Sequence, residues 1–193
     1  MADSIQAHAA DNLRYIRDAM SRASEFTAVP GWGGVAMGAS AVAAAAISGP
    51  PDGTVRWVAV WLADAAVAAT IGFVTTVRKA NRVGTPLFST AAAHRFALAY
   101  LPPLVAGMIL TPVFVTLDLM ARLPGCWLLL YGTALASGGA NAVRIVPLTG
   151  VAFMALSLVA FAAPAAWGHW MLAAGFGGLH IGFGLVIARK HGG

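Results

Sequence analysis

The chain has 193 residues, of which 59% are apolar and only 10% are charged, with a formal net charge of +5 at neutral pH. Soluble domains carry about 25% charged residues, and disordered chains combine high charge with low hydrophobicity, so both classes are excluded. The single cysteine, Cys126, excludes an intrachain disulfide and a cysteine-based zinc or iron–sulfur site. The composition therefore predicts an integral membrane protein.

The first 28 residues are expected to lie outside the membrane. Apolar residues recur in them at spacings of three and four, which is typical of an amphipathic helix over residues 4–24: Ile5, Ala9, Leu13, Ile16, Met20 and Ala23. The opposite side carries charges of both signs, so we expect this helix to dock on protein rather than to lie on the lipid surface. It is a candidate binding surface for a protein partner. Because no continuous apolar stretch is present, we do not expect a cleavable signal peptide.

Six later stretches are apolar enough over the roughly 20 residues that a membrane-spanning helix needs. They cover residues 29–48, 57–77, 96–117, 126–146, 147–167 and 170–188. None of them alternates apolar and polar residues with a period of two, which excludes a β-barrel. We therefore predict an all-α fold: an integral membrane bundle of six transmembrane helices over residues 29–193, preceded by a cytoplasmic amphipathic helix and linker over residues 1–28.

Prolines predict local features of two spans. Pro147 favours the start of a helix, so it separates the fourth span from the fifth. The third span contains Pro102, Pro103 and Pro112, and we expect it to be kinked or locally unwound.

The distribution of basic residues predicts the orientation. With the N-terminus in the cytoplasm, ten of the twelve basic residues fall on the inner side, and only Arg56 and Arg122 fall outside. Five tryptophans would then lie near the outer boundary, the level that Trp prefers: Trp57, Trp61, Trp127, Trp167 and Trp170. We expect a bacterial inner-membrane protein with both termini in the cytoplasm. Since the positive charge then serves orientation, we expect no nucleic-acid partner.

Two ionisable residues lie deep inside predicted spans. Asp64 lies about 10 Å and His180 about 16 Å from the outer end of its span, at 1.5 Å per residue. A charge in hydrocarbon costs at least about 2.5 kcal/mol, so such groups line a polar pathway or form structural hydrogen bonds. Both interpretations stay open. Asn141 and Arg144, near the inner end of the fourth span, are weaker candidates, because Arg144 can reach the headgroups and Asn141 can bond backbone carbonyls near Pro147.

Small residues at four-residue spacing indicate close helix packing in three spans. They are Gly34 and Gly38 in the first span, Gly132 in the fourth, and Gly178 and Gly182 in the sixth. Packing within the chain is one interpretation, and association of identical chains through these faces is the other. The glycines around His180 leave room for another helix or for a small solute.

The sequence contains few residues that could hold a cofactor or metal ion or catalyse a reaction. A haem held by two histidines needs a second buried histidine at the depth of His180, whereas the others lie at or outside the membrane boundary: His8, His94, His169 and His191. The spans contain no glutamate and no nucleophile-elbow pattern, so we predict no metal, no cofactor and no catalytic residue. A non-enzymatic protein is favoured.

The N-terminal segment DNLRYIRDAMSRASEFTAVPGWGGVAMG and the C-terminal segment GGLHIGFGLVIARKHGG resemble a group of small bacterial multi-pass membrane proteins. This resemblance implies a membrane protein and carries over no functional residue. The leading hypothesis is a small channel or transporter-like protein with a polar pathway near Asp64 and His180. The alternative is a membrane regulator or assembly partner that acts through the N-terminal helix.

Overall fold

The computed structural model describes residues 8, 12, 15, 27–84 and 90–191, and this part of the chain is all-helical, as the sequence predicts. The long helices are α2 (Gly31–Ser48), α3 (Val55–Arg82), α4 (Ala91–Thr116), α5 (Leu123–Gly138) and α6 (Ile145–Ala162). The last helix is continuous through three parts: α7 (Gly168–Leu172), the π-helix η4 (Ala173–Leu179) and α8 (His180–His191). The predicted helix over residues 4–24 lies almost entirely outside the described residues, although His8, Asn12 and Tyr15 are helical and exposed.

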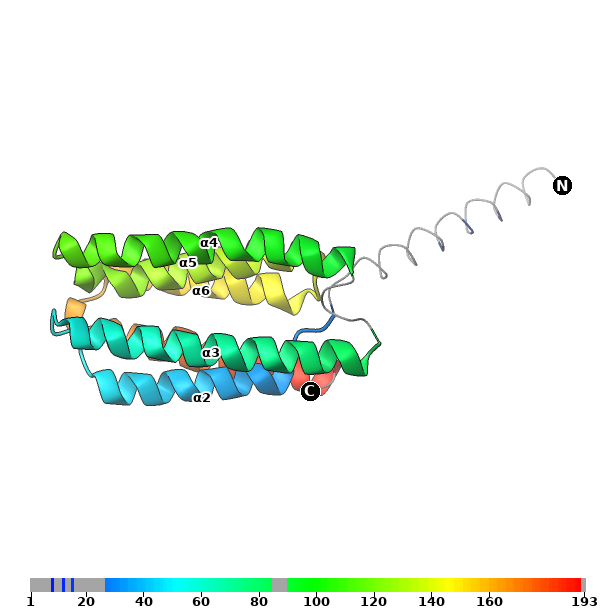
Figure 1. The fold of residues 1–193 in the computed structure, drawn as a ribbon, viewed down its shortest axis with the longest axis horizontal. Helices are drawn as coiled ribbons and strands as arrows, with labels where there is room; N and C mark the ends of the chain where they lie inside the picture. The colour runs from blue at the N-terminus through cyan, green and yellow to red at the C-terminus, as the bar shows by residue number, and fades with distance from the viewer. Residues whose placement is uncertain (1–7, 9–11, 13–14, 16–26, 85–89, 192–193) are drawn as a thin grey trace.

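The helices run alongside one another in alternating directions and form two halves (Figure 1). One half contains α2, α3 and the last helix, where α2 packs against both α3 and α8. The other half contains α4, α5 and α6, where α5 packs against both of its neighbours. The halves meet where α7 and η4 contact α5 and α6, whereas α3 and α4 do not pack closely against each other along their described lengths. This leaves space between α3 and α4.

Five helices of the described part are long and apolar enough to cross a membrane, and α5 is the exception. It has 16 residues, which is about 24 Å and less than the roughly 30 Å hydrocarbon core. The predicted helix start at Pro147 is confirmed to within two residues, because α6 begins at Ile145. The fourth span ends earlier than predicted, since α5 ends at Gly138 and a 3₁₀ turn (Gly139–Asn141) follows. Pro147 fits in the first turn of α6 because the N–H groups there have no partner inside the helix.

The prolines of α4 do not unwind it, because the helix is continuous from Ala91 to Thr116 (Figure 1). Pro103 has no N–H, and the Ala99 carbonyl one turn earlier therefore loses its usual donor. The Ser137 hydroxyl on α5 lies 2.9 Å from the Ala99 carbonyl oxygen and 2.7 Å from the Thr133 carbonyl oxygen of its own helix, so it shares its single hydrogen between the two. The irregular backbone lies in the last helix, where η4 contains Gly175, Gly177 and Gly178.

Tryptophans hold the two halves together at the end of the bundle where α3 begins. Trp57 and Trp61 are only 2% and 4% exposed, and the Trp57 ring stacks on Trp127 of α5 at 5.8 Å. Preference for lipid headgroups therefore does not explain Trp57 and Trp61, which are core residues. Trp167 and Trp170 are exposed at this end, in keeping with an interfacial position.

Glycines allow two helix pairs to approach closely. A Cβ at Gly38 of α2 would lie 2.6 Å from the Gly177 carbonyl oxygen, and one at Gly34 would lie 3.3 Å from the Gly184 Cα. On α5, a Cβ at Gly132 would lie 2.8 Å from the Gly150 carbonyl oxygen of α6.

The other two glycines singled out in the sequence, Gly178 and Gly182, lie on a different face of the last helix. A Cβ at Gly178 would meet only the Ala173 carbonyl oxygen, at 4.0 Å, and one at Gly182 would meet nothing within 4 Å. Both residues are exposed. Gly177 and Gly184 face α2 instead, where a Cβ at Gly177 would lie 2.7 Å from Val42 Cγ2 and one at Gly184 would lie 2.8 Å from the Gly31 carbonyl oxygen.

Candidate functional site

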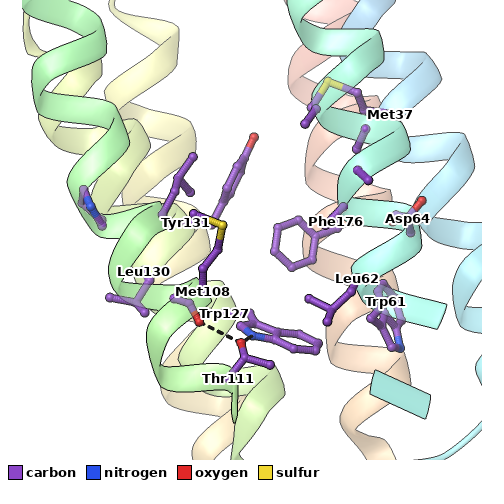
Figure 2. A pocket seen from close by; sticks show the side chains of 18 of the residues that line it. Met37, Trp61, Leu62, Asp64, Met108, Thr111, Trp127, Leu130, Tyr131 and Phe176 are labelled. Atoms are coloured by element: carbon purple, nitrogen blue, oxygen red, sulfur yellow. Dashed lines mark hydrogen bonds between the residues drawn. The ribbon is translucent and has the colours of Figure 1, made fainter. Parts of the chain in front are cut away.

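A partly open cavity of about 450 Å³ occupies the space between the two halves, and all the helices except α6 contribute to its wall. Figure 2 shows Trp61, Leu62 and Asp64 of α3 on one side, and the α4 and α5 side chains on the other. The wall is mostly apolar. The volume lies in the range typical of pockets that bind small molecules.

One face of α4 forms the wall opposite α3. Tyr100, Leu104, Gly107 and Thr111 follow one another at spacings of three and four residues, which places them on the same side of a helix. Gly107 makes room there, because a Cβ at this position would meet only Leu130 Cδ1, at 3.6 Å. The aromatic, aliphatic and small residues of this face therefore create the hollow.

Asp64 is the acidic residue of the α3 wall. It is half-buried and lies beside the Ser40 side chain of α2, whose hydroxyl donates to the Met37 carbonyl oxygen at 2.8 Å. Around Asp64, α3 contributes small residues to the wall, among them Ala65, Ala68 and Ala69. These alanines leave space beside the carboxyl group that larger side chains would fill.

His180, at the first position of α8, lines the same cavity and has a partner at each ring nitrogen. Its Nδ1 lies 2.9 Å from the Phe176 carbonyl oxygen, which can only accept, so Nδ1 carries hydrogen. Its Nε2 lies 2.7 Å from the Tyr131 hydroxyl of α5 and accepts the O–H of that group in the neutral ring. The imidazole is therefore held in one orientation and one tautomer.

Tyr131 is the centre of an aromatic cluster that the sequence analysis missed. Its ring centroid lies 4.9 Å from that of Phe153 and 5.2 Å from those of Phe176 and His180. Tyr100 approaches it edge-on at 6.3 Å. A signal was available, because Tyr100 and Tyr131 fall in the interior of predicted spans, whereas membrane tyrosines concentrate at the interfaces.

The end of the cavity nearest the stacked tryptophans also contains polar groups. The Trp127 Nε1–H donates to the Thr111 hydroxyl at 3.0 Å, and this hydroxyl donates to the Gly107 carbonyl oxygen at 2.7 Å. Trp61 also lines the cavity, and its buried Nε1 has no hydrogen-bond partner among the described residues. Trp61 thus retains one unused donor.

The structure brings together two of the four predicted pathway residues. Asp64 and His180 line one cavity, but they belong to different helices, and the ring nitrogens of His180 bond to Tyr131 and Phe176 instead of Asp64. Arg144 is exposed and directly precedes α6, at the end of the bundle where α3 ends and α4 begins. Asn141 belongs to the 3₁₀ turn before it, and its side chain lies outside the described part.

The ionisable groups of the wall are few. Among the described residues that line the cavity, Asp64 is the one carboxylate, His180 is the one imidazole, and none is Lys or Arg. No group of three His, Cys, Asp or Glu side chains suited to a metal ion occurs in the described part of the chain. The arrangement can bind a small molecule through apolar and aromatic contacts, with a carboxyl group and an imidazole as polar contacts.

Comparison of the chain with protein-family models, curated proteins and solved structures finds no match. The functional argument therefore depends on the geometry of this site.

Proposed function

We propose that the protein is a transporter-like membrane protein that binds a small, largely apolar molecule in the cavity at Asp64 and His180. The cavity between the two halves carries this proposal. A water-filled channel needs a continuous polar lining, whereas this wall is mostly apolar with a few polar groups, which favours a binding site over an open pore. Because α3 and α4 do not pack closely, a molecule dissolved in the bilayer could enter sideways between them.

The surface supports a position inside a bilayer. Large apolar side chains are exposed along helices of both halves, for example Ile47 of α2 at 62% and Leu98 of α4 at 73%. Such a surface would be unfavourable in water and suits hydrocarbon. Together with the turn Met120–Arg122 before it, α5 runs beside α4 and α6, which supports a sixth crossing (Figure 1).

The charges at the two ends support an orientation with the C-terminus in the cytoplasm. Seven basic residues lie at the end where α3 ends and α8 ends: Arg78, Lys79, Arg82, Arg95, Arg144, Arg189 and Lys190. The opposite end carries Arg56 and Arg122. This asymmetry follows the positive-inside rule and supports a position of residues 49–54 outside the cell.

Cysteine labelling in intact cells tests this topology. In a Cys126→Ala background, we expect a membrane-impermeant maleimide to label Asp52→Cys and not Val83→Cys until the cells are opened. Both positions are exposed, so burial does not limit the reaction. Labelling of both positions in intact cells would contradict the topology.

Binding of a neutral fluorescent probe tests the cavity. We expect N-phenyl-1-naphthylamine, which is apolar and fluoresces in dry sites, to bind the purified protein and to quench Trp61 and Trp127 by energy transfer. Ala68→Phe fills the cavity and should abolish the signal, whereas Ala63→Phe on the same helix lies outside the wall and should not. Equal binding to both variants would refute the assignment of the cavity as the site.

A further inference from the structure

The charge pattern around the cavity restricts the kind of molecule that fits it. Asp64 is the only acidic residue in the described helices, since Asp52 and Asp118 lie in connections between them. α2 and α5, which contribute wall residues on either side, contain no charged residue. The nearest basic residue of α3 itself, Arg56, lies about 12 Å away along the helix at 1.5 Å per residue. The Asp64 carboxylate therefore has no cation near it in the bundle.

An unpaired carboxylate in an apolar wall is unfavourable, because burial removes the water that stabilises its charge. Two arrangements avoid this cost: the carboxyl group holds a proton, or a cation lies beside it. The polar groups beside it and on the other walls supply no cation. They are Ser40 on α2, Tyr100 on α4, Tyr131 on α5 and His180 on α8, and the imidazole already accepts the hydrogen of Tyr131.

Aromatic rings form much of the remaining wall, and their faces attract cations. Trp61, Tyr100, Trp127, Tyr131 and Phe176 all line the cavity. Several are held in place by their neighbours: Trp127 by its stack on Trp57 and its bond to Thr111, and Tyr131 by Phe153 and His180. The rings are thus ordered before a ligand arrives, which lowers the entropic cost of binding.

We infer that the molecule bound in this cavity is a hydrophobic organic cation that exchanges with a proton on the Asp64 carboxyl group. This inference rests on the proposed function. When the cation enters, Asp64 releases one proton to water, and the carboxylate pairs with the bound positive charge; when the cation leaves, the proton returns. An anion of the same size meets the carboxylate and no basic side chain, so it is excluded.

Two ions of nearly equal size and opposite charge test the inference on the purified, full-length protein. We expect tetraphenylphosphonium to bind with an affinity that increases with pH, and tetraphenylborate not to bind. Calorimetry in buffers of different ionisation enthalpy should show about one proton released per cation bound. Asp64→Asn should weaken tetraphenylphosphonium binding at least about tenfold and remove its pH dependence, because the charge pair is lost. Asp64→Glu should retain both the binding of tetraphenylphosphonium and its pH dependence.

Asp118→Asn is the matched control. Asp118 lies in the connection after α4 with a φ of 56°, a conformation that Asn adopts readily, so this variant should fold and bind like the wild type. The neutral naphthylamine separates the two proposals. Suppose that the naphthylamine binds, but tetraphenylborate binds as well as tetraphenylphosphonium or Asp64→Asn has no effect on tetraphenylphosphonium binding. The cavity is then still supported as a binding site, and the cation inference is overturned. If neither the naphthylamine nor tetraphenylphosphonium binds, both proposals fail. Should Asp64→Asn not fold, proton release by the wild-type protein decides, and its absence overturns the inference.

Discussion

The close approach of α2 to the last helix predicts opposite effects for two glycine-to-alanine substitutions. In Gly38→Ala, the new methyl group would lie 2.6 Å from the Gly177 carbonyl oxygen, 2.7 Å from Ile181 Cγ1 and 3.0 Å from the Ile181 backbone nitrogen. Two of these three atoms belong to the backbone, so the helices must separate. In Gly182→Ala, the methyl group meets nothing within 4 Å.

The size of the difference follows from packing and helix propensity. Inserting a methylene into a packed interior costs about 1–3 kcal/mol, and alanine is favoured over glycine in a helix by up to about 1 kcal/mol. Gly38→Ala should therefore lower the free energy of unfolding by about 1–2 kcal/mol, and Gly182→Ala should leave it unchanged or raise it slightly. The two variants should differ by about 2 kcal/mol, which is a factor of roughly 30 in the equilibrium constant.

Unfolding in mixed micelles, with sodium dodecyl sulfate as the denaturant and helix content followed by circular dichroism, measures this difference. Equal destabilisation by the two substitutions would refute the register of the last helix. The same variants address association of identical chains. If Gly182→Ala lowers stability and also converts a larger assembly into a monomer in light scattering, the exposed face of Gly178 and Gly182 is an interface between copies.

Two further predictions concern individual hydrogen bonds. Tyr131→Phe leaves His180 Nε2 without its donor and should reduce the free energy of unfolding by about 1 kcal/mol, whereas the exposed Tyr15→Phe should not; equal stabilities of the two variants would show that the bond contributes nothing. Ser137→Ala should cost about 1 kcal/mol in the wild-type chain and less in a Pro103→Ala background, where residue 103 regains an N–H for the Ala99 carbonyl. Additive effects of the two substitutions would contradict the idea that Ser137 compensates the Ala99 carbonyl for the N–H that Pro103 lacks.

Several parts of the structure could be predicted from local pattern. Runs of about 20 apolar residues were sufficient to locate five of the long helices, because the length of a membrane-spanning segment depends on bilayer thickness alone. The depths of Asp64 and His180 followed from their distance to the span ends. Their placement in one cavity did not follow, since depth along a helix says nothing about which neighbour the residue faces.

Other features depended on contacts between helices that no local pattern encodes. Pro103 interrupts the hydrogen bonding of α4, and only the position of Ser137 on a neighbouring helix shows how the Ala99 carbonyl is satisfied. The four-residue spacing pointed to Gly178 and Gly182, whereas the glycines that contact α2 are Gly177 and Gly184, which are seven residues apart. Tyr131 became part of the site because Phe153, Phe176 and His180 converge on it from two other helices.

The low proportion of charged residues was sufficient to predict the class of protein, because hydrocarbon-spanning helices exclude charge wherever they occur. The distribution of the basic residues was sufficient to predict an orientation, since that preference acts on each connecting segment separately. The site could be found only from the packing of the helices. The cavity exists because α3 and α4 stay apart while α5 and the last helix bring Tyr131, Phe176 and His180 to the same cavity as Asp64. Such a juxtaposition results from the packing of distant segments.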